Sequence, residues 1–499
     1  MDLSLPFTDV VLTIVKPLHK TDHIKTIDPI SIDIVSTDAY VPLFFAYRLG
    51  DNSHSTYLQL SKRLRESLQK VLVPFFSFAG RWVASPNSLG NRQLLCSDEG
   101  VPFTEAYLDR DLDSVVHTSA AFQPVPELQG YDFVNMDMTQ FRQEMQPEGL
   151  PCIFVQVTRF KCGGLVLAVT FNHMHTDGKG FFDFMTAWSD FSISNKETTT
   201  TIAVEHNRAL AEKESFKTFI SRGKTTETSA SSTAAAAAGS KGRDGPTKVE
   251  GLRDIKSFEV SAQTIKSLKQ EAKECNIGGA AGFASTGDCI IAHFWKALSK
   301  VPSSILGGNG NVNANVKKEL AISMAVEGRN RFYHPPLPNL CGNAVAAMVA
   351  PIIPSTELQQ MSVASIACKI REKLMATTTD EWLGFDRLQE ALLVSRSPEF
   401  ACVRVTSWYG FPMYGIDFGF GRPFFVSGVN SRFILREIGT IIIAPAIPSS
   451  LESVATVSIM SSQGVIEALE RDLEFILLFL PPGKAINERC VNQVLKTVI

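Results

Sequence analysis

Two short motifs, far apart in the chain, carry the residue types that could do chemistry. The first is His173-Met-His-Thr-Asp177-Gly178, with the pattern H-x-x-x-D-G, and the second is Asp417-Phe-Gly-Phe-Gly421, with the pattern D-F-G-x-G. A histidine exchanges protons near neutral pH, so His173 suits a general base. The glycines of the second motif suit a turn rather than a strand or a helix. H-x-x-x-D arises often by chance whereas D-F-G-x-G is rare, so the combination is the informative signal.

The residues around His173 predict the elements that must position it. Residues 152–160 and 165–172 have the pattern of two strands, joined by Lys161-Cys-Gly-Gly164, which is a hairpin signal. Large apolar residues then recur at helical spacing, at Phe181, Phe184, Met185, Trp188 and Phe191. The first motif is therefore expected at a strand-to-helix connection, where rigid elements hold a short loop.

Both halves of the chain mix helices with strands. In the first half, residues 58–72 predict a helix, and residues 74–82 an extended segment after it. In the second half, helices are expected at 262–275 and 286–300, and strands at 320–326, 344–350, 440–445 and 454–460. We therefore expect an α/β fold class in both halves.

A change in composition separates the two halves. Residues 223–247 are small, polar and rich in alanine, and such a segment buries too little apolar surface to offset its ordering entropy. We expect an N-terminal domain at 1–222, a crossover linker at 223–247 and a C-terminal domain at 248–499. A chain of 499 residues is long enough for more than one core.

The composition argues against several classes of protein. A net charge of -3 gives no electrostatic reason to expect nucleic acid or an anionic membrane as a partner. The nine cysteines show no C-x-x-C spacing, which argues against a disulfide framework and a zinc site and favours a reducing compartment. The first residues lack a basic region followed by an apolar core. We expect a cytoplasmic monomer with no metal ion and no membrane insertion.

Further segments make the sequence resemble the BAHD family of acyl-CoA-dependent acyltransferases along nearly the whole chain. Beside the two motifs, these segments are Leu72-Val-Pro-Phe-Phe-Ser-Phe-Ala-Gly-Arg81, Glu99-Gly-Val-Pro-Phe-Thr-Glu-Ala106, Glu327-Gly-Arg-Asn-Arg331, Pro335-Pro-Leu-Pro338 and Thr406-Ser-Trp408. The resemblance implies two chloramphenicol-acetyltransferase-like domains, each a mixed sheet flanked by helices, with a channel between them. It also implies an acyltransferase that moves a group from CoA to the hydroxyl of a small-molecule acceptor in a ternary complex. Acyl-CoA is then a co-substrate, and no cofactor is bound permanently.

The resemblance also assigns roles around the first motif. His173 would be the general base, because an alcohol is a poor nucleophile until a base takes its proton. Asp177 would point away from the channel and fix the loop through a salt bridge to an arginine, for which Arg329 and Arg331 are the candidates. His175 is expected to face elsewhere, without a catalytic role.

Residues of the second half complete the site that the resemblance implies. Thr406 and Trp408 would line the reacting centre and stabilise the oxyanion; without the resemblance, the same segment would be a strand with a core tryptophan. The turn with Asp417, Gly419 and Gly421 would be structural and brace the C-terminal half near the CoA channel.

The start of the helix expected at 286–300 has two interpretations. Ser285 and Thr286 either cap the helix or contact the phosphate or pantetheine of CoA. His293, in the middle of the same helix among apolar residues, is expected to be a packed core histidine.

Phe420 stands where the family usually has tryptophan and keeps the aromatic bulk of that position. Three other places in the sequence bear on the substrates. Asn339-Leu-Cys-Gly-Asn343 departs from the segment that marks flavonoid-glycoside acylating members. Glu99-Gly-Val instead favours the hydroxycinnamoyltransferase-like branch. Arg396 is either a handle for an acceptor carboxylate or a solvated surface charge.

Three other functions remain as alternatives. The acceptor atom could be an amine nitrogen. A condensation-type domain of peptide synthesis shares H-x-x-x-D-G, but usually has a second histidine where this chain has Asn172. A non-catalytic family member could act as an interaction partner in fatty-acid elongation, although such relatives commonly lose D-F-G-x-G.

Overall fold

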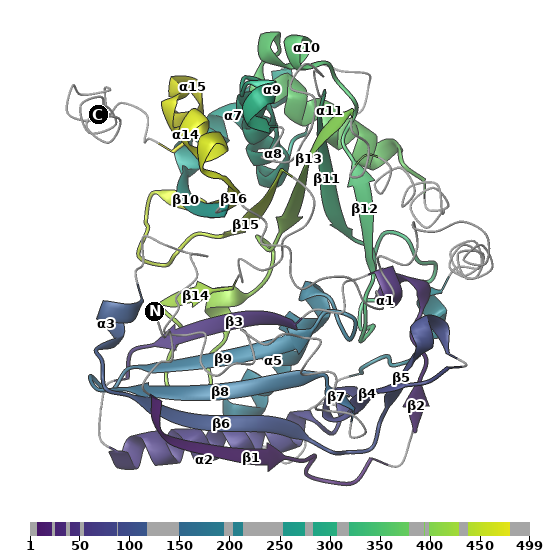
Figure 1. Cartoon of the computed structure of the whole chain (residues 1–499), viewed down its shortest axis with the longest axis vertical. Helices are drawn as coiled ribbons and strands as arrows, with labels where there is room; N and C mark the ends of the chain where they lie inside the picture. Colours follow the sequence, from purple (N-terminus) through teal and green to yellow (C-terminus); the bar gives the residue numbers. More distant parts are fainter. Residues whose placement is uncertain are drawn as a thin grey trace. The chain divides into compact units, whose positions relative to one another are not determined.

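A computed structural model of the chain is shown in Figure 1. The residues that it describes are 7–21, 25–35, 40–49, 54–86, 88–116, 149–193, 203–212, 253–274, 283–306, 319–378, 394, 399–428 and 438–479. The chain forms two compact units. Unit 1 consists of Met1–Arg243, Glu327–Val345 and Pro412–Asn430, and unit 2 of Asp244–Val326, Ala346–Phe411 and Ser431–Ile499. The linker expected at 223–247 lies outside the described residues.

Unit 1 is built around a mixed six-stranded sheet. In sheet order, its strands are β1 (Phe7–Val15), β6 (Val101–Leu108), β8 (Ile153–Phe160), β9 (Leu165–Asn172), β3 (Tyr40–Tyr47) and β14 (Phe425–Ser427). β6 and β8 are parallel, and the other neighbouring pairs are antiparallel. The predicted hairpin is confirmed as β8 and β9, and Gly163 takes the positive φ of 82° that the tight turn requires.

Helices and a small sheet complete unit 1. The helices are α1 (Ser31–Val35), α2 (His54–Val71), α3 (Leu112–Val115) and α5 (Gly178–Ile193), and short 3-10 turns are η1 (Phe76–Ala79), η2 (Leu89–Asn91), η4 (Arg208–Ala211) and η6 (Met413–Gly415). The small sheet has the order β2 (Thr26–Ile27), β5 (Arg92–Leu95), β4 (Arg81–Ala84) and β7 (Leu150–Pro151). The extended segment expected at 74–82 instead begins with η1, because the Phe78 side chain turns inward and stacks on Phe184 at 4.4 Å.

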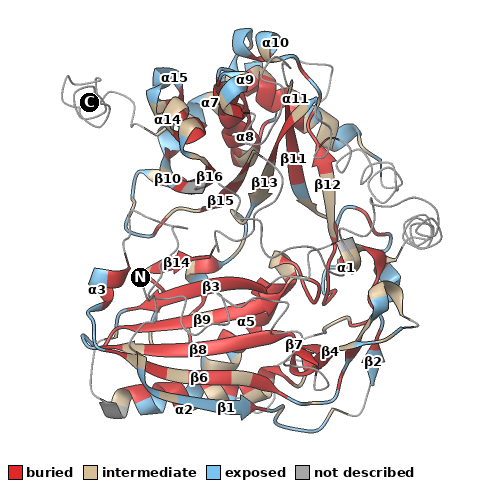
Figure 2. Ribbon diagram, in the orientation of Figure 1, coloured by how far each residue is buried: buried red, intermediate tan, exposed pale blue. Residues whose placement is uncertain are grey.

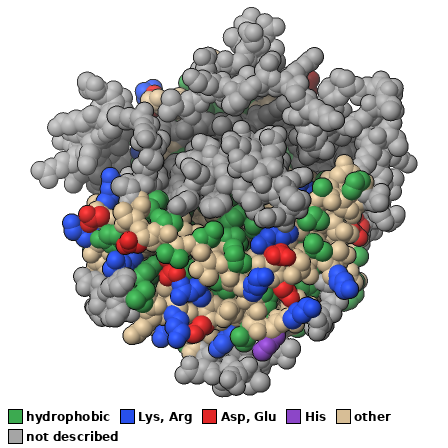
Figure 3. Space-filling model, turned by 60° about the horizontal axis from the view of Figure 1, so that its bottom comes forward, with side chains coloured by type: hydrophobic (Ala, Val, Ile, Leu, Met, Phe, Trp, Pro, Cys, Tyr) green, Lys and Arg blue, Asp and Glu red, His purple; other side chains and the backbone are tan. Residues whose placement is uncertain are grey.

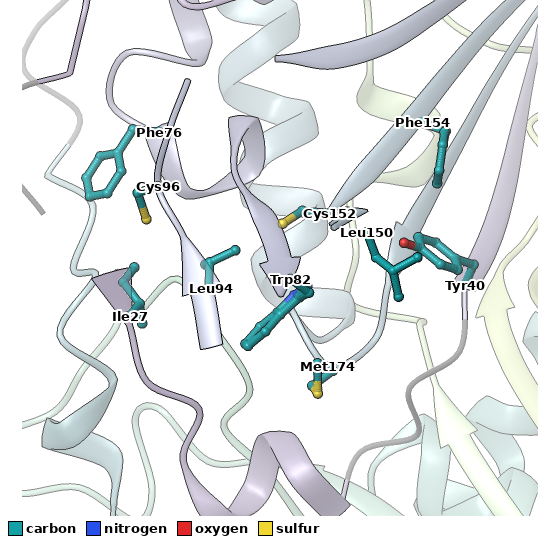
Figure 4. Packing of buried hydrophobic residues seen from close by; sticks show 10 residues of the cluster. All are labelled: Ile27, Tyr40, Phe76, Trp82, Leu94, Cys96, Leu150, Cys152, Phe154 and Met174. Carbon is teal, nitrogen blue, oxygen red and sulfur yellow. The ribbon is translucent and has the colours of Figure 1, made fainter. Parts of the chain in front are cut away.

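The core of unit 1 lies along the central strands. Figure 2 shows burial concentrated on β3, β8 and β9, and all eight residues of β3 are buried. Continuous burial means that side chains on both faces of the strand are shielded from water. A second cluster of buried residues lies around Trp82 in β4 and includes Met174 of the first motif (Figure 4). The motif is thus anchored to the core by an apolar side chain.

One face of unit 1 is shown in Figure 3. Basic and acidic side chains are interspersed there with apolar ones, so no large area of one sign is visible. The outermost strand β1 exposes Val11, Leu12 and Ile14.

Unit 2 has a second mixed six-stranded sheet. In sheet order, its strands are β10 (Arg253–Ser261), β16 (Ser453–Ser462), β15 (Gly439–Pro445), β13 (Phe400–Ser407), β11 (Glu319–Glu327) and β12 (Val345–Val349). Its helices are α7 (Ala262–Glu274), α8 (Thr286–Ser299), α9 (Ser303–Leu306), α10 (Ser355–Gln360), α11 (Val363–Ala376), α14 (Gln463–Arg471) and α15 (Leu473–Ile476). The helices and strands expected in this half are all present, and the predicted α/β fold class is confirmed in both units. None of the helices in the described ranges has the length and apolarity needed to span a membrane.

Candidate active site

The first motif forms the connection between β9 and α5, as the sequence predicted. β9 ends at Asn172 and α5 begins at Gly178. Asn172 closes the turn between them, because its carbonyl accepts from the amide of His175 at 3.0 Å and its side-chain Oδ1 accepts from the amide of Met174 at 2.8 Å. The His173 side chain is half-buried at this turn. The predicted general base, His173, is therefore carried on a hydrogen-bonded turn between two regular elements.

Asp177 lies at the other end of the turn and is paired with Arg329. The guanidinium donates from Nη1 to Oδ2 at 2.9 Å and from Nη2 to Oδ1 at 3.0 Å, and both side chains are 1% exposed. The amides of Gly180 and Ala344 also donate to the carboxylate, at 2.9 and 2.8 Å. Of the two candidate arginines, Arg329 is the one that makes this pair, whereas Arg331 is exposed.

The surroundings of Asp177 keep it ionised. Burial raises the pKa of this carboxyl group, but the charge and hydrogen bonds of Arg329 and the two backbone amides outweigh burial, so the pKa lies below its usual value. A carboxylate with both oxygens engaged in this way is suited to orientation. The geometry thus matches a bracing role for Asp177 in the motif.

His175 occupies a different environment from His173. Its ring is fully buried and packs edge-on against Phe78, with ring centroids 4.5 Å apart. Burial, followed by the nearby positive charge of Arg208, holds the pKa of His175 well below its usual value. His175 therefore faces the core, as the sequence analysis expected.

The glycine-rich turn is held together by its own aspartate. Oδ1 of Asp417 accepts from the amides of Gly419 at 2.8 Å and Gly421 at 3.0 Å. These glycines have φ values of 89° and 103°, a region that side chains with a Cβ strongly disfavour. The residue types of D-F-G-x-G are thus explained by the backbone of the turn.

The contacts of this turn differ from the expectation that it braces the C-terminal half. Phe418 is buried against Trp188 of α5, with ring centroids 4.9 Å apart, and Phe420 packs edge-on against Tyr47 of β3. The following strand β14 adds to the edge of β3. The physical reason is that a sheet edge and an aromatic surface in unit 1 are both satisfied by this segment. The turn therefore packs on the elements that flank the first motif.

Thr406 and Trp408 lie in unit 2, at the carboxyl end of β13. The amide of Trp408 donates to the carbonyl of Ile443 in β15 at 2.6 Å. Both side chains are half-buried, whereas Trp82 and Trp188 of unit 1 are fully buried. Trp408 is therefore not a core tryptophan, and part of its indole remains accessible.

Ser285 forms the N-terminal cap of α8. Its hydroxyl accepts from the amide of Asp288 at 3.1 Å, and the Asp288 carboxylate accepts from the amide of Ser285 at 2.8 Å, which together make a capping box. Asp288 also accepts from Arg371 at 2.8 Å, and Thr286 is buried. The capping interpretation is confirmed for Ser285. Arg396 lies outside the described residues.

His293 is a packed core histidine, as expected. It is 6% exposed, its Nε2 lies 2.8 Å from the carbonyl oxygen of Phe475, and its ring stacks on that of Phe475. Burial lowers the pKa of His293 to about 4.

This shift predicts a contribution of His293 to the pH dependence of stability. Its pKa in the unfolded chain is about 6.5, so the unfolded state binds more protons between about pH 6.5 and 4, and stability is lost as the pH falls through that window. Relative to the parent, His293→Gln should lose about 2 kcal/mol less between pH 7 and pH 5. Urea unfolding at the two pH values measures this difference. Parallel losses in both proteins would contradict the prediction.

Two residues that the sequence analysis did not single out as catalytic contact the turn of the first motif, namely Arg208 and Asn343, and a third, Asp33, binds both of them. One signal was available in the sequence, because Asp33 is a lone carboxylate in the apolar run from Ile30 to Val35. A buried charge of this kind requires a partner. No pattern identified Arg208 as that partner. Across the described ranges, no group of His, Cys, Asp or Glu side chains could hold a metal ion.

Comparison with known proteins identifies the family. A family model described as the Transferase family matches residues 9–474. The chain is 25% identical over 482 residues to hydroxycinnamoyl-CoA:piscidic acid hydroxycinnamoyltransferase of Actaea racemosa, covering 86% of this chain and 94% of the relative. It is 28% identical over 424 residues to agmatine hydroxycinnamoyltransferase 1 of Oryza sativa subsp. japonica, covering 79% and 83%.

A solved structure shares the fold. The structure of F. graminearum TRI101 complexed with coenzyme A and T-2 mycotoxin matches with a TM-score of 0.64 and 16% identity, covering 91% of this chain and 99% of that one. The family model spans nearly the whole chain. The chain therefore belongs to this Transferase family, the BAHD acyl-CoA acyltransferases.

Proposed function

We propose that this protein transfers an acyl group, of the hydroxycinnamoyl class, from a CoA thioester to the hydroxyl of a small-molecule acceptor, with His173 as the general base. The observation that carries the proposal is a half-buried histidine on a turn held by Asn172 at one end and by the Asp177–Arg329 pair at the other. Membership of an acyltransferase family supports the reaction class. The Glu99-Gly-Val segment and the names of the relatives support the acyl group.

In the proposed reaction, His173 takes the hydroxyl proton as the acceptor oxygen attacks the thioester carbonyl. A carbon–oxygen bond forms, and the carbonyl oxygen becomes an oxyanion. We assign its stabilisation to the hydroxyl of Thr406 and the indole N–H of Trp408. The oxyanion then collapses, the carbon–sulfur bond breaks, and the CoA sulfur recovers the proton from His173. The acyl group thus passes from the CoA sulfur to the acceptor oxygen, and the proton passes from the acceptor to CoA. No covalent enzyme intermediate is needed.

The proposal extends to substrate contacts and setting. Ser285 and Thr286 are proposed to lie close to CoA, with the Ser285 hydroxyl still acting as the cap of α8. Arg396 is proposed as a handle for an acceptor carboxylate. The same proposal includes a crossover linker at 223–247. It also includes action as a monomer in the cytoplasm, without a permanently bound cofactor.

An amine acceptor is the second candidate. It is favoured by one observation, namely that a relative covering most of this chain is named for agmatine, which is an amine. An amine that arrives protonated must lose a proton before it attacks, so a base at His173 would serve this reaction as well. The two candidates share the site and differ in the acceptor atom.

The proposed function is tested by mass spectrometry. The purified protein is incubated with a hydroxycinnamoyl-CoA and with piscidic acid, agmatine and shikimate as acceptors. We expect one new product, with the mass of the acceptor plus the acyl group less one hydrogen, together with an equal amount of free CoA. An ester would support the first candidate and an amide the second. Absence of product together with absence of CoA binding by calorimetry would contradict both and favour a non-catalytic family member.

A further inference from the structure

A buried polar cluster lies behind the turn that carries His173. It consists of Asp33 from α1, Arg208 from η4 and Asn343, and all three are 2% exposed or less. Arg208 donates from Nη1 to Oδ2 of Asp33 at 2.9 Å, and Asn343 donates from Nδ2 to Oδ1 of Asp33 at 2.8 Å. The three side chains come from distant parts of the sequence but belong to the same compact unit.

The donors of this polar cluster are aimed at three consecutive carbonyl groups of the turn. Nδ2 of Asn343 lies 3.0 Å from the oxygen of His173 and 3.2 Å from that of Met174. Arg208 donates from Nη1 to Met174 at 3.3 Å and from Nη2 to the oxygen of His175 at 2.6 Å. The peptide group before the His173 Cα is fixed because the carbonyl of Asn172 accepts from the amide of His175. The peptide group after it is fixed by Asn343 and by Oδ1 of Asn172, which accepts from the amide of Met174.

The backbone around Asn343 runs along the same turn. The carbonyl of Gly342 accepts from Arg329 at 2.7 Å, and the amide of Ala344 donates to Asp177 at 2.8 Å. Asn343 is therefore held on both sides by the Asp177–Arg329 pair, and its side chain is directed to the other end of the turn. Because the backbone of Asn343 is fixed and its side-chain amide also binds the buried Asp33, this amide needs little reorganisation to donate to the carbonyl of His173.

The charges of the cluster explain its composition. An arginine buried without a counter-charge would be strongly unfavourable, and Asp33 supplies that charge. The planar guanidinium of Arg208 can then donate to two neighbouring carbonyls at once, which a lysine ammonium cannot do with the same geometry. The pair thus supplies charge-assisted donors to the carbonyls of Met174 and His175.

We propose that Asn343 is a positioning residue for His173, and that the Asp33–Arg208 pair holds Asn343 and the next carbonyls of the turn in place. The inference rests on the proposed function, in which His173 is the base. Asn343 binds the backbone carbonyl of His173 and so fixes the position of the Cα from which the imidazole side chain extends. A displacement of about 1 Å in a reacting group can cost on the order of 10²-fold in rate.

The test is a double-mutant cycle between Asn343 and His173. CoA release from a hydroxycinnamoyl-CoA is measured with the acceptor found by mass spectrometry. Asn343→Ala should lower kcat by on the order of 10²-fold and leave KM nearly unchanged. In the His173→Ala background, the same substitution should have no further effect on the residual rate, because the group that it positions is gone. A role in stability alone would lower the rate by the same factor in both backgrounds.

Two further variants keep the test decisive. Arg208→Lys retains the charge beside Asp33 but loses the fork, and it enters the same cycle if Asn343→Ala does not fold. Ser67→Ala is the matched control, because Ser67 is buried in unit 1 and accepts from Trp188 Nε1 at 3.0 Å without contacting the turn. We expect this control to lower the melting temperature and to leave kcat unchanged.

The outcomes separate the positioning role from the proposed function. Unchanged kcat in Asn343→Ala and Arg208→Lys, or an equal loss in both backgrounds, would overturn the positioning role while His173 remained the base. A His173→Ala protein as active as the parent would overturn the proposed function. In that case the titration of the His173 ring is compared between Asn343→Ala and the parent by NMR with 13C-labelled histidine. A shifted titration would show that Asn343 and the His173 side chain are coupled. An unshifted titration would overturn the positioning role as well.

Discussion

His173→Ala is expected to lower the rate of CoA release by about 10²- to 10⁴-fold, the range typical of general-base catalysis. Affinity for the acyl-CoA should change little, because the base acts on the acceptor proton during attack. The fold should be retained, since the His173 side chain is half-buried and the turn is held through its backbone. The measurements are steady-state kinetics and calorimetric binding of CoA.

A matched control for this variant is His293→Gln at pH 7. His293 is a buried histidine of unit 2 with a structural contact to Phe475, so its replacement should leave the rate constant unchanged. A His173→Ala protein with the parental rate would remove His173 from the mechanism. A fall in both variants would indicate instead that the assay responds to folding.

Local sequence patterns predicted the elements around the site well. Two strand-like runs joined by a glycine pair within residues 152–172 predicted the hairpin, and helical spacing after Asp177 predicted α5. These signals are local, because the period of a strand or helix and the conformation of a turn depend on neighbouring residues. Strands β1, β3, β6 and β10 were not predicted, and β13 was anticipated only at its end, by the alternative interpretation of Thr406-Ser-Trp408 as a strand.

Long-range contacts were less accessible from the sequence. Arg329 and Arg331 are two positions apart and chemically identical, yet one is buried on Asp177 and the other is exposed. The difference depends on where Leu340 and Gly342 place their carbonyls, which accept from Arg329. No local pattern encodes that arrangement.

The glycine-rich turn shows the same limit. Its residue types predicted a turn, and Asp417 and the two glycines explain why. Its packing on α5 depends on the match between Phe418 and Trp188, which are far apart in the chain. The sequence analysis expected this segment to brace the second half of the chain, because the contact between Phe418 and Trp188 cannot be read from a local pattern.

The Asp177–Arg329 pair supports the second large prediction. Asp177→Asn removes the negative charge but leaves the arginine in a site where both side chains are 1% exposed. Breaking a buried pair by removing one partner typically costs about 3–5 kcal/mol, because the remaining charge stays uncompensated. We expect a loss of this size in the free energy of unfolding, measured by urea denaturation at pH 7.

The loss should also depend on pH with a definite sign. The pKa of Asp177 in the folded protein is below its usual value, so the stability that it contributes is present above the ordinary carboxyl range and is lost as the pH falls through the folded pKa. The parent should therefore lose its advantage over Asp177→Asn on acidification. A constant difference between the two proteins across the acid range would contradict this origin.

The surface pair of Arg48 and Asp113 provides the matched control for Asp177→Asn. Its closest contact is 2.7 Å, comparable with the buried pair, but its side chains are 58% and 65% exposed. Exposed pairs are worth about 0–1 kcal/mol, so Asp113→Asn should change stability little. The pairs share residue types and belong to the same compact unit, so they differ in burial and in the two backbone amides that donate to Asp177. If Asp177→Asn were as mild as Asp113→Asn, the buried pair would not be what braces the turn of His173, and the bracing would have to come from the side of Asn343.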